Sequence, residues 1–178
     1  METRNAVRCI TATLALLALA NGGAVAGEPE VWTGLDFQFV RGDGVDGTAP
    51  ENQDRITENV WIARGNFQGI YNAAQEGGYT INVSPVDTEW ATGSAADWES
   101  LTFQPWQAWT GGAPDGPPNS VGVEAVVHLI TDDIYIDIRF DSWTASGGGG
   151  FAYMRATGQT PVAAASWSAI KGRFSERD

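Results

Sequence analysis

The sequence has very little of three residue types that mark common kinds of site. Of 178 residues, one is cysteine, one is histidine and one is lysine, whereas 22 are acidic and 10 are basic. Zinc sites use several Cys or His ligands, and nucleic acids and anionic membranes bind basic surfaces. With one cysteine and one histidine, the chain is not expected to bind zinc in the usual way. With a net charge of −12, it is not expected to bind nucleic acid or an anionic membrane.

The sequence also lacks an apolar run of the roughly 18 residues that a transmembrane helix needs. Its longest apolar run covers the twelve residues 9–20, follows Arg4 and Arg8, and precedes the small residues at 24–26. A positive start, a short apolar stretch and a small-x-small site are the three parts of a secretory signal peptide. We therefore predict a signal peptide over 1–26, cleaved after Ala26, and a secreted or periplasmic mature protein.

The predicted mature chain has no cysteine, because the single one, Cys9, lies in the signal peptide. It retains 21 acidic and 8 basic residues, and no insertion into a membrane is expected after cleavage. Without disulfides, its 152 residues must be stabilised by a hydrophobic core, and a chain of this length is long enough to form one.

A β-hairpin is the clearest structural pattern. Alternating apolar residues predict one strand over 134–141 and a partner strand over 121–130, joined by a tight turn at 131–133. Two registers remain open. A turn at Asp132-Asp133 places His128 opposite Asp137, whereas a turn at Thr131-Asp132 places His128 opposite Tyr135 and Glu124 opposite Arg139.

Shorter strands separated by turn-rich segments predict an all-β fold over residues 27–160. The further expected strands are 31–40, 60–63, 67–71, 79–83, 101–103 and 151–155. Many short strands with frequent turns are typical of an antiparallel two-sheet sandwich or a jelly roll. Residues 161–178 are expected to be a C-terminal tail with a short helical turn that docks Trp167 and Ile170 on the sandwich.

Three blocks of sequence carry a resemblance to a known family. They are residues 52–65 (NQDRIT, NVWI and RG), residues 89–93 (EWAxG), and residues 128–157 (HLITDDIY, Phe140, SW, GGGG and FxYxRAT). Together they resemble a family of uncharacterised secreted bacterial proteins. The resemblance implies export, but it implies no activity and no site residues.

Tryptophans suggest a first candidate site. Indole rings stack on sugar rings, and Trp90, Trp98, Trp106 and Trp109 follow one another in a turn-rich stretch. A glycan-binding platform is one interpretation. The alternative is that these rings fill the ends of the sandwich, as expected for Trp61 and Trp143, which are assigned to the core.

Two acidic patterns are weaker candidates for sites. Asp43, Asp46 and Asp54, in or after a glycine-rich loop, are candidate calcium ligands, and calcium is the only cofactor that the sequence suggests. Turns in which carboxylates cap their own backbone explain the same pattern. Arg41-Gly42-Asp43 also spells a cell-adhesion triplet.

His128 and Asp137 form the last candidate, a polar pair that exists only in the first hairpin register. A hydrolase would also need a nucleophile or a second acid, and no motif indicates one. The sequence therefore favours an exported, non-catalytic binding or surface module for a glycan or an extracellular protein. A glycan-active hydrolase and a structural matrix protein remain the alternatives.

Overall fold

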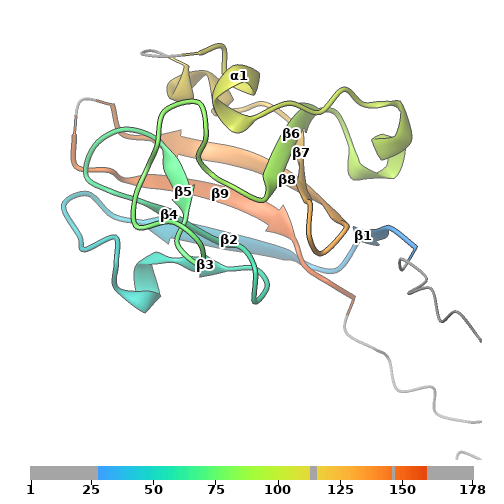
Figure 1. Ribbon diagram of the computed structural model, residues 1–178, viewed down its shortest axis with the longest axis horizontal. Coiled ribbons are helices and arrows are strands. Elements are labelled where there is room, and N and C mark those ends of the chain that lie inside the picture. The colour runs from blue at the N-terminus through green and yellow to red at the C-terminus, as the bar shows by residue number, and fades with distance from the viewer. Residues whose placement is uncertain (1–27, 113–115, 146, 160–178) are drawn as a thin grey trace, which may run out of the picture.

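The computed structural model describes residues 28–112, 116–145 and 147–159. They form an all-β sandwich of a large and a small sheet, as predicted (Figure 1). The large sheet comprises β1 (Glu30–Trp32), β2 (Asp36–Arg41), β6 (Thr88–Thr92), β7 (Ala125–Leu129), β8 (Ile134–Trp143) and β9 (Phe151–Ala156). The small sheet comprises β3 (Asp54–Arg55), β4 (Trp61–Arg64) and β5 (Ile70–Asn72). Helical turns are short: η1 (Pro50–Asn52), η2 (Ala95–Ser100), α1 (Trp106–Trp109) and η3 (Pro117–Ser120).

In the large sheet the strand order is β2-β9-β8-β7-β6, and β1 pairs in parallel with the start of β8. The predicted hairpin is β7–β8, and it has the second register: His128 pairs with Tyr135, not with Asp137. The ladder closes at Leu129 and Ile134, with a four-residue loop between them. Asp133 ends that loop at φ 54°, a left-handed conformation that Asp adopts more readily than most residues.

Other expected strands need correction. The segment 31–40 is interrupted between β1 and β2, and Leu35 is 87% exposed there. Segments 79–83 and 101–103 form turns and irregular backbone, whereas β6 was not expected. The turn at 80–83 is held by the Ser84 hydroxyl, which accepts a hydrogen bond from the Thr80 N–H at 2.7 Å. Local side-chain bonds of this kind compete with strand pairing.

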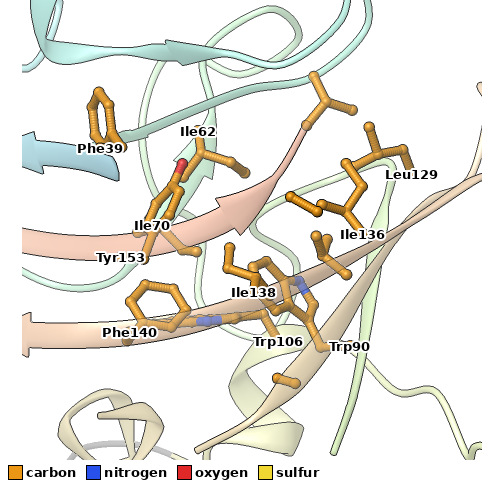
Figure 2. Close-up of a cluster of buried hydrophobic side chains, with 14 of the residues drawn as sticks. Phe39, Ile62, Ile70, Trp90, Trp106, Leu129, Ile136, Ile138, Phe140 and Tyr153 are labelled. Carbon is orange, nitrogen blue, oxygen red and sulfur yellow. The ribbon is translucent and has the colours of Figure 1, made fainter. Parts of the chain in front are cut away.

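The core lies between the sheets and is built from the alternating positions of both. Figure 2 shows Ile62 and Ile70 of the small sheet against Ile136, Ile138, Phe140 and Tyr153 of the large sheet. We call the surface of the large sheet that faces this core its inner face and the opposite surface its outer face. Trp143 packs against the core as expected, but Trp61 lies on the far side of the small sheet, beneath the Arg55 guanidinium.

A buried ion pair joins the two sheets. Asp54 of β3 accepts hydrogen bonds from Nε and Nη2 of Arg155 of β9, at 2.7 and 2.8 Å. The Tyr153 hydroxyl donates to the same carboxylate at 2.6 Å. Burial alone would lower the pKa of Arg155, but the hydrogen bonds and charge of Asp54 outweigh it, so the pKa is raised.

Alkaline pH should therefore weaken the fold through Tyr153. Burial, followed by the charge of Asp54, raises the pKa of this phenol well above 10. Stabilisation that depends on the neutral phenol is complete below pH 10, the unfolded value, and is lost as the pH rises above it. We expect Tyr153→Phe to lose less stability than the wild type between about pH 10 and 11.5, measured by urea unfolding at each pH. Parallel stability curves for the two proteins would contradict this assignment.

The predicted signal peptide over 1–26 and the predicted C-terminal tail over 161–178 lie outside the described residues. Within the ranges described, none of the helices has the length and apolar character needed to cross a membrane.

Candidate functional site

The outer face of the large sheet is divided into a covered half and an open half. Over β7 and the start of β8, a small cluster of Ala95, Val126 and Tyr135 is covered by Trp98, Leu101 and Phe103. Over β2, β9 and the end of β8, the outward side chains include exposed Gln38 and Arg139 and half-buried Met154. The covering segment 95–103 therefore ends beside a free part of the sheet surface.

An open groove of about 230 Å³ lies on this face. We call it the sheet groove; its lining is Asp36, Glu124, Asp137, Ile138, Arg139, Met154, Arg155 and Ala156. The contributing strands are neighbours in the sheet but far apart in the sequence: Asp36 belongs to β2 and Met154 to β9. The alternation along β8 directs Asp137 and Arg139 away from the core, as the sequence predicted.

Charges in the groove are partly paired. Arg139 lies 3.3 Å from Glu124 and 3.2 Å from Asp141, in exposed ion pairs. Hydrogen bonds to Asp141, and then to Glu124, raise the pKa of Arg139. Asp137 accepts a hydrogen bond from the backbone N–H of Ala95 through Oδ1 at 2.6 Å, which fixes the start of η2. The groove thus presents carboxylate acceptors and one guanidinium donor.

The four tryptophans do not form one surface. Trp90 and Trp106 are 0% and 1% exposed and lie within the core cluster (Figure 2), so they cannot stack on an external ligand. Trp109 stacks on Trp90 with ring centroids 5.7 Å apart, on the same side of the sheet. Trp98 packs on the outer face instead, 4.3 Å from the Tyr135 ring. Trp90 and Trp106 are therefore part of the core and not of a ligand-binding platform.

The three candidate calcium ligands have separate roles in the fold. Asp54 is 4% exposed and holds Arg155 and Tyr153. Asp46 accepts hydrogen bonds from the N–H and hydroxyl of Thr48, and Asp43 accepts one from the N–H of Gly150. No group of three acidic, His or Cys side chains in the described part of the chain is placed to hold a metal ion. The turn interpretation is therefore correct for Asp46 alone, because Asp43 binds the backbone of a distant loop and Asp54 forms an ion pair.

His128 does not meet Asp137. Its Nδ1 lies 2.9 Å from Glu89 and its Nε2 lies 3.2 Å from Asp133. The ring is stacked on Tyr135 with centroids 4.1 Å apart, and the residue is 8% exposed. Carboxylates only accept hydrogen bonds, so both contacts are hydrogen bonds only when both ring nitrogens carry protons. Neither nitrogen is left free to face a substrate.

Two buried arginines organise the loops at one end of the sandwich. Arg64 donates to the carbonyls of Gln68, Gly150 and Thr144, at 2.9–3.0 Å. Arg41 donates to Gly148 and Val45 carbonyls and to Asn66 Oδ1. Burial, and then the charge of Arg41, lowers the pKa of Arg64 to about 10, so it stays charged at neutral pH. Since Arg41 is 1% exposed, the Arg41-Gly42-Asp43 triplet is not available to a receptor.

Sequence reasoning missed most of the sheet groove. It placed Asp137 and Arg139 on a solvent face, but it gave no signal that Asp36 and Met154 lie beside them. It also missed Glu89 as the partner of His128, because β6 was not recognised as a strand.

Comparisons with known proteins place the chain in no family. No protein-family model matches it, and searches of curated proteins and of solved structures return no significant match.

Proposed function

We propose that the chain is an exported, non-catalytic binding module that holds a neutral, hydroxyl-rich ligand, such as one ring of a glycan, in the sheet groove. The observation that carries this proposal is the groove itself, an open hollow on the uncovered half of the large sheet. Ligand sites combine an apolar surface with a few polar groups that fix orientation. Met154 and Ala156 supply the apolar surface. The polar groups are supplied by Asp137, Glu124 and Arg139.

The charges of the groove favour neutral sugars over acidic ones. Carboxylates accept hydrogen bonds from hydroxyl groups, and a guanidinium donates to their oxygens. Asp36, Glu124 and Asp137 outnumber Arg139, since Arg155 is engaged by Asp54. An acidic polysaccharide would be repelled. The volume is below the roughly 300–1,000 Å³ of sites that enclose a small molecule, which suits one ring of a longer chain lying across an open surface.

Binding without catalysis also fits the surroundings of the one described histidine. A general acid or base must reach the proton that it transfers. His128 is enclosed by Glu89, Asp133 and Tyr135, and it lies beside the covered half of the sheet. The hydrolase alternative would require this enclosure to open.

The test is retention of residues 27–178 on a panel of insoluble neutral and acidic polysaccharides and bacterial cell-wall material. On the glycan that retains the protein, Arg139→Gln is expected to weaken binding roughly tenfold, the loss of about one charge-assisted hydrogen bond. Isothermal titration calorimetry with a soluble oligosaccharide of that glycan gives the ratio of the dissociation constants of the variant and the wild type.

Arg55→Gln is the matched control, because it makes the same change at an exposed arginine on the small sheet. Binding should be unchanged in this variant, and both variants should keep the wild-type melting temperature within a few degrees. Equal affinity of the two variants would remove the groove as the site. Failure of the wild type to bind any glycan would favour an extracellular protein ligand or a structural role.

A further inference from the structure

An apolar patch lies open at one edge of the large sheet. We call it the edge patch: Trp32, Leu35 and Phe37. Leu35 is 87% exposed, Phe37 is 41% exposed, and Trp32 is half-buried. The strand that carries Phe37, β2, is last in the strand order and pairs only with β9 among the described strands. Free edge strands with exposed apolar residues readily pair with other chains unless something covers them.

Few of the common protective devices are present at this edge, because the charged residues of β2, Asp36 and Arg41, stand only at its two ends. β2 contains no lysine or proline, and its six-residue ladder with β9 has no bulge. In the figure, β2 runs along the border of the large sheet (Figure 1). The Arg155 guanidinium lies 4.8 Å from the centre of the Phe37 ring and 6.0 Å from that of Trp32. Leu35 and the free edge of β2 have no such cover among the described residues.

The C-terminal tail begins beside the edge patch. Thr157 donates through its N–H and its hydroxyl to the Leu35 carbonyl, and the Gln159 amide donates to the Thr33 hydroxyl at 2.7 Å. Nineteen residues follow, with Trp167 eight positions after Gln159. Eight extended residues span up to about 28 Å, which is ample for a return to a surface this close.

Charge also favours a return of the tail to the rest of the chain. Residues 27–159 hold 19 acidic and 5 basic side chains, whereas residues 160–178 hold Lys171, Arg173 and Arg177 against two acids. All five arginines of residues 27–159 already contact backbone carbonyls, carboxylates or the Trp61 ring. The tail therefore adds basic and apolar side chains to a strongly acidic domain.

We propose that the tail of the same chain folds back and packs Trp167 and Ile170 on the edge patch, so that it covers the free edge of β2. In this arrangement the basic residues of the tail lie close to the acidic residues of the segment 27–159. This inference is independent of the sheet groove.

A lysine-specific protease tests the proposal, because Lys171 is the only lysine and lies in the tail. In the mature chain 27–178, cleavage after Lys171 should be at least roughly tenfold slower than in a free peptide of residues 160–178, since it follows the population of undocked tail. Leu35→Ser with Phe37→Ser, and separately Trp167→Ala, should restore the peptide rate. Val40→Ser is the control, because Val40 is 60% exposed on the same strand but lies on the outer face.

Equal cleavage rates in the peptide, the wild type and all variants would overturn the proposal. Protection that increases with protein concentration would also overturn it, because the tail would then be seated on a second copy. Circular dichroism of each variant confirms that the sandwich is folded, and the exposure of Leu35 makes loss of the fold by its substitution unexpected.

Discussion

Asp54→Ala is expected to lower the free energy of unfolding by about 3–5 kcal/mol, the usual effect of removing one partner from a buried ion pair. The change leaves the Arg155 guanidinium, 7% exposed, without the carboxylate that its Nε and Nη2 bind. It also removes the acceptor of the buried Tyr153 hydroxyl. Because these contacts link β3 to β9, the loss should appear as a lower urea midpoint in a single cooperative transition.

Asp141→Ala is the matched control for this prediction. It also removes a carboxylate partner of an arginine, but Arg139 and Asp141 are on the surface, where ion pairs contribute little. A second variant, Asp54→Leu combined with Arg155→Met, should recover part of the stability lost in Asp54→Ala, because no charge is left buried. Similar small losses for Asp54→Ala and Asp141→Ala would show that the buried pair does not hold the sheets together.

The same contact joins two blocks of sequence, the first (residues 52–65) and the third (residues 128–157), that lie far apart along the chain. Asp54 of the first block binds Arg155 of the third, and Arg64 donates to Gly150. Asp132 of the third block accepts hydrogen bonds from the Thr57 hydroxyl and the Asn59 amide of the first. We infer that these residues specify the packing of the two sheets.

The fold class could be predicted because the signals for it are local. Alternation along β8 fixes which side chains face the core, and the short loop after β7 fixes its partner. Pairing of β2 with β9 joins residues more than 100 positions apart, and no local pattern encodes that. The part of the sheet groove on β2 and β9 depends on this pairing, so only the β8 residues and Glu124, which the second register places opposite Arg139, could be anticipated.

The tryptophans illustrate a second limit. Trp90 and Trp98 are eight residues apart, and both have polar neighbours in the sequence. One lies in the core and the other on the outer face, because the chain crosses from β6 to η2 between them. The composition predicted that aromatic rings pack in the fold. Which face of the large sheet each ring packs on could not be predicted without the positions of β6 and of the covering segment 95–103.

Gly149→Ala is the second change with a large expected effect, about 3–5 kcal/mol of lost stability when backbone strain and lost charged hydrogen bonds are combined. Gly149 has φ +73°, a left-handed conformation that disfavours a side chain. An added Cβ would also collide with the Gly65 carbonyl oxygen and with Arg41 Nη1. Moving the loop would withdraw the Gly148 and Gly150 carbonyls from Arg41 and Arg64.

Gly122→Ala separates these two causes. Gly122 has φ +78°, nearly the same conformation, but no atom lies within 4 Å of where its Cβ would be. Gly122→Ala should therefore lower the free energy of unfolding only by the backbone strain, about 1–2 kcal/mol, measured by the same urea titration. The difference between the two variants then reports how strongly the loop holds the buried guanidinium groups. Equal losses would mean that the loop around Gly149 can move aside, and that Arg41 and Arg64 find water or other carbonyls without it.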